Sequence, residues 1–366
     1  MITSMAALHQ LTERLATESL IAVDTESNSL YAYREQVCLI QISTRHEDWL
    51  IDPLAVHDLT ALGALMANAA IEKVLHAADN DVMCLKRDFG FTFANLFDTM
   101  QAARVLGRKN VGLGSLLEDY FGVRVNKAYQ RANWAVRPLP REQLDYARMD
   151  THYLPALRDM LRKELEEKDH LTEALELFEA ITALSPSVQI FDPDGYWHIN
   201  AARDLSRRQM AILRELYLLR DQLAFQRDVP PFKIATDEAL ATLARSGAQT
   251  IAEITALPGC SGLGRYGSEF VAAVKRGWAA PLPSRPSEPR IDDATLARYN
   301  RLRDWRKARA AERGVESDVI ISKEALWAMA VHVPQTMTDL ESVTGLGPWR
   351  RERYGEALLR LLAEDA

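Results

Sequence analysis

The stretch LIAVDTES, residues 20–27, decides the fold of the first part of this chain. Four apolar residues precede two acidic ones, which is typical of a buried strand that ends in polar side chains. Asp24 and Glu26 are two positions apart, and alternate residues of a strand point to the same face of a sheet. The stretch therefore predicts a strand that presents two carboxylates on one face at its end.

Further apolar runs predict a sheet around this strand. Residues 37–43, 48–52 and 73–77 have the composition of strands, and helical spacing of apolar residues is found at 58–69, 79–89, 99–107 and 141–168. The second and third strands follow the first too closely for helical crossovers, so we expect an antiparallel meander at the start of a mixed sheet. Residues 1–185 are thus predicted to form one α/β domain.

The chain after about residue 200 is helical and contains an internal repeat. At an offset of 86 positions, Leu216 matches Leu302, Arg220 matches Arg306, and DEAL at 237–240 matches KEAL at 323–326. RYG then recurs at 265–267 and 353–355. A repeat of this length predicts two copies of one all-α module, at 203–280 and 293–366. Proline- and glycine-containing stretches at 186–202 and 281–292 are predicted linkers.

Composition sets limits on the class of protein. The 366 residues carry a net charge of −7, and neither an uncharged apolar signal segment nor an apolar run of membrane-spanning length is present. Cys38, Cys84 and Cys260 are too far apart for a disulfide framework or a zinc pair, so we expect a cytoplasmic protein. An acidic chain is not expected to bind nucleic acid through its overall charge.

The charge is unevenly distributed. Residues 1–200 contain 19 basic and 29 acidic residues, residues 201–280 contain 11 and 8, and residues 281–366 contain 14 and 14. The acidic excess therefore belongs to the α/β domain. The helical modules carry local clusters of arginine that could contact phosphates.

Other acidic positions could share a site with the first strand. Tyr146 and Asp150 are four residues apart in a predicted helix, which places them on one face. Asp81 lies in the first turn of the helix expected at 79–89, and Asp98 is expected to cap the helix that follows it. Grouped carboxylates repel one another unless a cation neutralises them, and oxygen ligands suit Mg²⁺ or Mn²⁺.

The order and spacing of four motifs carry a resemblance. The chain resembles the tyrosine-containing branch of the DEDD superfamily of 3′–5′ exonucleases, and its two repeats look like HRDC domains. The whole architecture is similar to that of the bacterial ribonuclease D family, which implies a ribonuclease H-like exonuclease domain with a mixed sheet. The matching motifs are DTE at 24–26, HAADND at 76–81, FDT at 97–99 and YARMD at 146–150.

The resemblance assigns catalytic residues by position. It implies a site made of Asp24, Glu26, Asp81, Tyr146 and Asp150. The four acids would hold two divalent ions, Mg²⁺ or Mn²⁺, and the tyrosine would orient the attacking water.

Three residues near these motifs are not assigned to the catalytic site. HAADND departs from the usual HAGxxD pattern by an additional acid, Asp79, which we expect to be a helix-start residue. His152 follows Asp150 instead of preceding it, so it does not match the histidine-containing branch and is expected to be structural or exposed. Trp134 is expected to pack beside the third motif.

The implied activity is stepwise hydrolysis of RNA from its 3′ end, with release of nucleoside 5′-monophosphates. Precursor tRNA and other small structured RNAs are the implied substrates, and we expect the protein to act as a monomer. RNA contacts are expected from arginines of the second helical copy, namely Arg298, Arg301, Arg306 and Arg309.

Two alternatives remain open at this point. The first is a DNA 3′–5′ exonuclease, because nothing in the carboxylate motifs distinguishes ribose from deoxyribose. The second is a non-catalytic RNA-binding adaptor with a decayed nuclease fold. That alternative would require a lost carboxylate, whereas all of the motif acids are present.

Overall fold

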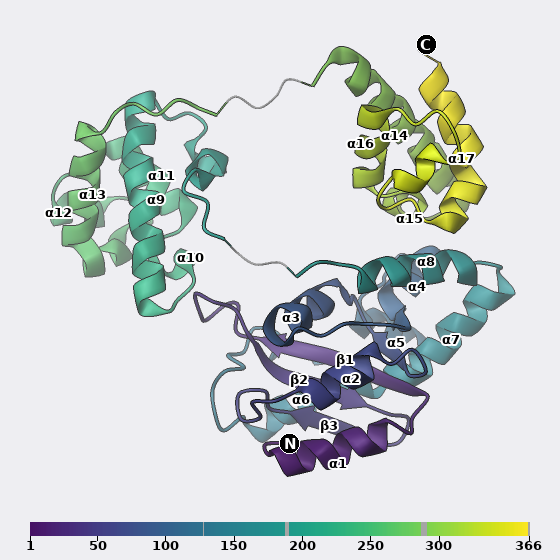
Figure 1. Cartoon of the computed structure of the whole chain (residues 1–366). Helices are drawn as coiled ribbons and strands as arrows, with labels where there is room; N and C mark the ends of the chain where they lie inside the picture. Colours follow the sequence, from purple (N-terminus) through teal and green to yellow (C-terminus); the bar gives the residue numbers. More distant parts are fainter. Residues whose placement is uncertain (127, 187–189, 287–290, 365–366) are drawn as a thin grey trace. The chain divides into compact units, whose positions relative to one another are not determined.

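The computed structural model describes residues 1–126, 128–186, 190–286 and 291–364, which divide into two compact units (Figure 1). The first unit contains residues 1–26, 37–187 and 290–366, and the second contains residues 27–36 and 188–289. The α/β domain and the second helical copy therefore belong to one unit. Within the predicted linkers, residues 187–189 and 287–290 lie outside the described residues.

A mixed sheet forms the centre of the first unit. In the described residues it has five strands in the order β3-β2-β1-β4-β5. β2 and β3 are antiparallel, whereas β4 runs parallel to β1 and to β5. The mixed sheet predicted from sequence is confirmed. Its strands are β1 (Leu20–Ser27), β2 (Val37–Ser43), β3 (Asp48–Ile51), β4 (Glu72–Leu75) and β5 (Leu96–Asp98).

Helices flank this sheet. The helix predicted over 141–168 is in fact two helices that meet at Tyr153, with Pro155 in the first turn of the second. Proline has no N–H to continue the hydrogen bonding of a preceding helix, but it is tolerated in a first turn. The helices are α1 (Met5–Leu15), α2 (Thr60–Ala67), α3 (Asp79–Phe89), α4 (Thr99–Val105), α5 (Leu113–Phe121), α6 (Arg141–His152), α7 (Leu154–Glu167) and α8 (Leu171–Thr182).

Both repeats are helical, as predicted, and each begins with a helix of 21 residues. The copy in the first unit consists of α14 (Asp293–Arg313), α15 (Ser317–Ile320), α16 (Lys323–His332), the short 3₁₀ helix η4 (Asp339–Ser342) and α17 (Pro348–Ala363). The copy in the second unit consists of α9 (Arg207–Arg227), α10 (Pro231–Ile234), α11 (Asp237–Ser246), α12 (Ile251–Ala256), η3 (Ser261–Tyr266) and α13 (Gly267–Ala279), preceded by η1 (Gly195–His198) and η2 (Asn200–Ala202).

A matched arginine serves the same structural purpose in each copy. The guanidinium group of Arg220 donates to the carbonyl oxygen of Ala235 at 3.2 Å, and that of Arg306 donates to the carbonyl oxygen of Ile321 at 2.9 Å. Both pairs are related by the offset of 86 positions found in the sequence. The repeat is therefore a repeat of hydrogen bonding as well as of residue types.

The second helical copy packs against the α/β domain, where α17 lies beside α8 (Figure 1). Glu173 is fully buried and accepts two hydrogen bonds from Arg313, at 2.7 and 2.8 Å. Glu176 accepts one from Arg350 at 2.6 Å, and Val319 of α15 joins the apolar core of the α/β domain. Buried charges are tolerated when they are paired and hydrogen-bonded in this way.

In the second unit, the segment 27–36 packs on the long helix α9. The Tyr33 hydroxyl donates to Asp221 at 2.6 Å, and its ring makes an edge contact with Phe225 at 5.5 Å between centroids. The segment that follows the two acids of β1 is thus held by residues almost 200 positions further along the chain.

Cys38, Cys84 and Cys260 are buried and are not joined in disulfide bonds. Across the described ranges, none of the helices combines the length and apolarity that crossing a bilayer requires.

We expect Arg350→Met to reduce the free energy of unfolding of the first unit by about 3–5 kcal/mol, because the largely buried Glu176 loses its guanidinium partner and the fully buried Glu173 loses a neighbouring positive charge. Arg350 is 2% exposed and also donates to the carbonyl oxygens of Val319 and Ile320. Urea denaturation measures the change. Arg360→Met on the exposed side of the same helix is the control and is expected to change stability by less than about 0.5 kcal/mol. Equal urea midpoints for the two variants would contradict the expected contribution of Arg350.

Candidate active site

Three of the predicted acids converge in the first unit. Asp24 and Glu26 lie at the end of β1, and Asp150 lies near the end of α6. Each offers a carboxylate oxygen, and these oxygens all lie within 4.8 Å of one another. Strand alternation directs the first two side chains to one face, where the helix supplies the third. The structure therefore assembles one cluster from residues more than 120 positions apart.

Aromatic packing fixes the position of α6, which lies against β2. Tyr146 and Ala147 are buried in a small apolar cluster with Cys38 and Leu39 of β2. Trp134 is only 1% exposed, and its ring centroid lies 6.1 Å from that of Tyr146. The expectation that Trp134 packs is confirmed. Because Tyr146 and Asp150 are one turn apart, this packing also sets the position of the Asp150 carboxylate.

Asp81 lies beside the cluster of three oxygens instead of within it. It is in the first turn of α3, is 7% exposed, and its Oδ1 accepts a hydrogen bond from the hydroxyl of Thr25. Its negative charge contributes to raising the pKa of both Asp24 and Glu26. The sequence pattern did not single out Thr25, since strand alternation alone gives no reason for it to meet a carboxylate from another element.

Asp98 caps α4, as predicted, and also has a second function that the sequence did not show. Its carboxylate accepts hydrogen bonds from the backbone N–H groups of Gln101 at 2.9 Å, Ala78 at 2.7 Å and Ala77 at 3.3 Å. Ala77 has a φ of 59°, in the left-handed region that is unfavourable for alanine. Asp98 thus stabilises the turn that leads from β4 into α3 and positions Asp81.

The neighbouring polar residues are placed outside the cluster. Asp79 is the first residue of α3 and is exposed, as expected of a helix-start residue. His152 is also exposed and its Nδ1 lies 2.8 Å from a carboxylate oxygen of Asp48. The Nδ1 of His76 lies 2.9 Å from the Thr99 hydroxyl, and burial lowers the pKa of His76 to about 4. His76 is therefore neutral near pH 7.

The four arginines proposed as RNA contacts lie on α14. The Nε atoms of Arg298 and Arg301 donate to the carbonyl oxygens of Ala330, at 2.8 Å, and Leu361, at 3.3 Å. Together with the bond of Arg306 to Ile321, these contacts commit part of three guanidinium groups to the fold of the helical copy. Arg309 is exposed and pairs with Glu312 at 2.6 Å.

Burial and mutual repulsion govern the protonation of the cluster. Burial first, and then the charges of Asp150 and Asp81, raise the pKa of Glu26 to about 9. Burial and the charge of Asp81 raise the pKa of Asp150 to about 7, and burial raises that of Asp81 to about 7. The pKa of Asp24 is raised well above its usual value by burial and by the other three acids.

Tyr146 is affected in the same direction. Burial and the negative charges of Asp150, Glu26 and Asp24 raise the pKa of its phenol. The hydroxyl therefore stays protonated at neutral pH and is able to donate a hydrogen bond.

The carboxylate cluster offers oxygen ligands only. Such a cluster fits hard divalent cations, whose charge would relieve the repulsion.

Comparison with known families agrees with this geometry. A family model described as a 3′-5′ exonuclease matches residues 1–166, and the HRDC domain model matches residues 209–274 and 295–362. The fold and the carboxylate cluster thus define a 3′–5′ exonuclease of the DEDD class that carries two HRDC domains.

Individual relatives narrow the class. The chain is 31% identical to ribonuclease D of Acidiphilium cryptum over 369 aligned positions, which cover 99% of this chain and 92% of that protein. The crystal structure of Escherichia coli RNase D has 26% sequence identity and a TM-score of 0.69, and the match covers 99% of this chain and 98% of that one. This chain belongs to the ribonuclease D family of 3′–5′ exoribonucleases.

The similarity extends to eukaryotic proteins over part of the chain. Exosome complex component 10 of Mus musculus is 38% identical over 236 residues, and the match spans 62% of this chain and about a quarter of that protein, 27%. The catalytic core of RRP6 from Trypanosoma brucei matches with a TM-score of 0.70 and 28% identity, covering 76% of this chain and 79% of that one.

We expect Asp150→Asn to raise the melting temperature of the metal-free protein at pH 8. The folded-state pKa values of the cluster acids lie above their unfolded values, so deprotonation disfavours the folded state. The metal-free wild type should lose stability as the pH rises from about 4 to about 9. The variant removes one of the repelling charges, and its advantage should shrink toward pH 4.5.

Thermal unfolding in the presence of a chelator, followed between pH 4.5 and 9, measures this effect. Asp145→Asn is the matched control, because Asp145 is exposed on the same helix. A lower melting temperature for Asp150→Asn than for Asp145→Asn at pH 8 would contradict the repulsion described above.

Proposed function

We propose that this chain trims the 3′ ends of precursor tRNA and other small structured RNAs, and that it releases nucleoside 5′-monophosphates. The observation that carries the proposal is the meeting of Asp24, Glu26 and Asp150 within 4.8 Å. Clustered carboxylates with raised pKa values are suited to holding divalent cations close to a phosphodiester. The relative from Escherichia coli is described as an exoribonuclease involved in structured RNA processing, which supports this choice of substrate.

In the proposed mechanism, Asp24, Glu26, Asp81 and Asp150 would hold two divalent cations, Mg²⁺ or Mn²⁺. Bound cations would favour deprotonation of the attacking water and stabilise charge on the leaving 3′ oxygen. Protons compete with cations for the same oxygens, so cation affinity should rise with pH through the raised pKa values of these acids.

Tyr146 is proposed to orient the attacking water. Its phenol has a raised pKa because of burial and nearby negative charge, so it keeps its proton and acts as a hydrogen-bond donor instead of a general base. Trp134 and Tyr129 pack against its ring at 6.1 and 6.0 Å between centroids and hold it in place.

Thr25 and Asp98 are proposed as positioning residues. The Thr25 hydroxyl donates to Asp81, and Asp98 holds the backbone turn that precedes α3. Both would orient the carboxylate of Asp81, which comes from α3, whereas the other three acids come from β1 and α6.

The second HRDC domain is proposed to contact the RNA. Arg309 is the exposed member of the four arginines of α14, whereas Arg298, Arg301 and Arg306 are part-buried and bonded within the domain. We therefore expect Arg309 to contribute most directly to RNA affinity. That affinity should fall as salt concentration rises, because phosphate binding releases counterions.

Asp24→Ala is expected to reduce 3′ trimming of a precursor tRNA by at least about a thousandfold, since it removes a carboxylate from the cluster. The assay compares the wild type and the variant with and without Mg²⁺ and identifies the released nucleotides by chromatography. Asp79→Ala is the matched control, because Asp79 is an exposed acid near Asp81. Equal loss in both variants, or internal cleavage by the wild type, would contradict the proposal.

A matched DNA strand distinguishes the sugar preference. We expect the wild type to shorten an RNA oligonucleotide faster than a DNA oligonucleotide of the same sequence, and equal rates would contradict the proposed substrate.

Tyr146→Phe is expected to lower turnover by about 10²–10³-fold, because the ring still packs but no hydroxyl is left to donate a hydrogen bond to the attacking water. The stabilisation of the protein by Mn²⁺ should persist, since Tyr146 supplies no carboxylate oxygen to the cluster. Steady-state kinetics and thermal shifts with Mn²⁺ check the two effects separately. A normal rate would show that Tyr146 only packs.

A further inference from the structure

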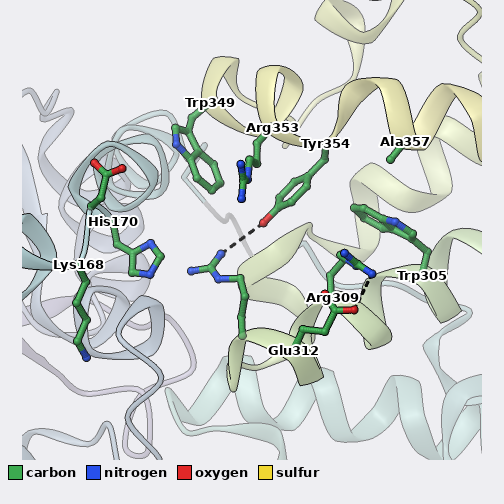
Figure 2. Close-up of a pocket in the computed structure, with 11 residues that line it drawn as sticks. Lys168, His170, Trp305, Arg309, Glu312, Trp349, Arg353, Tyr354 and Ala357 are labelled. Carbon is green, nitrogen blue, oxygen red and sulfur yellow. Dashed lines mark hydrogen bonds and ion pairs between the residues drawn. The ribbon is translucent and has the colours of Figure 1, made fainter.

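A cavity of about 620 Å³ lies within the first unit, where the second HRDC domain meets the turn between α7 and α8 (Figure 2). Its volume is within the range of about 300–1,000 Å³ that is usual for small-ligand sites. None of the residues that line the cavity belongs to the carboxylate cluster. The lining residues are Lys168, Asp169, His170, Trp305, Arg309, Glu312, Arg313, Trp349, Arg353, Tyr354 and Ala357.

Aromatic rings form one part of the cavity wall. Trp305 of α14 and Trp349 of α17 each make an edge contact with Tyr354, at 5.4 and 5.8 Å between ring centroids. Tyr354 is 8% exposed and its hydroxyl lies 3.5 Å from the guanidinium group of Arg313. Both tryptophans are partly exposed. Rings that are held rigidly and remain accessible are the platforms on which proteins stack unpaired bases.

Cationic side chains line the same cavity as these rings. Lys168 and Arg353 are exposed, and within the described ranges their side chains make no hydrogen bond or ion pair. Arg309 pairs with the exposed Glu312, a surface contact that is weak in water. Arg313 is different, because it is committed to the fully buried Glu173. Lys168, Arg309 and Arg353 therefore line the cavity without being committed to a buried carboxylate.

The tryptophans are particular to this copy of the repeat. At the offset of 86 positions, Leu219 and Leu223 of the first copy occupy the positions of Trp305 and Arg309, and both leucines belong to the core of the second unit. The first copy has no tryptophan between Gly259 and Tyr266. Arg353 and Tyr354, by contrast, recur as Arg265 and Tyr266. The two copies of the HRDC scaffold thus differ in the residues that supply the tryptophans and Arg309 of this cavity.

We propose that this cavity binds an unpaired nucleotide of the RNA substrate, with its base stacked on Trp305 or Trp349 and its phosphate held by Lys168, Arg309 and Arg353. The proposal rests on the proposed function, because it assumes that RNA is the substrate. Flat aromatic surface beside accessible cations matches a nucleotide, which combines a planar base with a negative phosphate.

The test measures binding of a fluorescent oligoadenylate RNA of twelve nucleotides to the full chain. The buffer contains a chelator, which removes divalent cations and so prevents hydrolysis. Trp349→Ala should weaken binding about tenfold, because a stacked base loses its platform. Arg353→Ala and Lys168→Ala should each weaken binding and lower the slope of log affinity against log salt by about one. Since both cations are exposed, these two variants test the cavity without endangering the fold.

Matched controls lie outside the cavity, on α17, which carries Arg353, and on α7, which Lys168 directly follows. Arg360→Ala on α17 and Lys163→Ala on α7 are expected to bind within twofold of the wild type. If all four charge variants lose affinity equally, or if none does, the proposed cavity is wrong. Competition by polyglutamate as effective as that by oligoadenylate would also overturn the proposal.

A second readout separates this proposal from the proposed function. With Mg²⁺, the cavity variants should hydrolyse a dinucleotide RNA at the wild-type rate, because none of the altered residues belongs to the carboxylate cluster. They should trim a precursor tRNA more slowly at limiting substrate. Failure of the wild type to hydrolyse either RNA would refute the proposed function. If the variants trim and bind RNA as well as the wild type does, the proposal for the cavity is refuted and the proposed function is not.

Discussion

Mutual repulsion among carboxylates that are at least half-buried is the constraint on which the candidate site of the first unit depends. Asp24 and Glu26 follow from the geometry of a single strand, but bringing Asp150 within 4.8 Å of them requires a helix fixed against β2. Trp134 and Tyr146 supply that packing. Asp98 stabilises an unfavourable backbone conformation so that α3 can present Asp81. Strain and repulsion of this kind persist at functional sites only because the surrounding structure is stable enough to hold them.

The second HRDC domain is joined to the same unit by charges of a different kind. At the carboxylate cluster like charges meet, whereas at this interface Glu173 and Glu176 each meet a guanidinium group. The helices that supply Arg313 and Arg350 also carry Trp305, Trp349 and Arg353 around the cavity. One set of side chains on α14 and α17 therefore fixes the domain, and neighbouring side chains remain available to a ligand.

Much of this architecture could be predicted because its causes are local. Alternation in β1 predicted the shared face of Asp24 and Glu26, and helical spacing predicted the shared face of Tyr146 and Asp150. β5 escaped prediction because three residues are too few to show alternation. The break at Tyr153 was missed although Pro155 signalled it.

The long-range contacts could not be predicted in the same way. The bond between Thr25 and Asp81 and the pairing of Arg313 with Glu173 join positions 56 and 140 residues apart, and no local pattern specifies such partners. For the same reason, arginine content alone did not distinguish Arg306, which the fold uses internally, from the exposed Arg309. Arg220 in the first copy makes the same bond to a carbonyl oxygen as Arg306 does, which indicates a structural role, but this bond is seen only in the three-dimensional structure.

The pairing of Arg313 with Glu173 also bears on how duplicated modules diverge. Its counterpart in the first copy, Arg227, lies over the ring of Tyr266, just as Arg313 approaches Tyr354, so an arginine beside a tyrosine is common to both copies. In the second copy the arginine also pairs with a carboxylate of the α/β domain. One position of the repeat thus serves a single fold in the first copy and joins two folds in the second, so the same substitution at that position would have unequal consequences in the two copies.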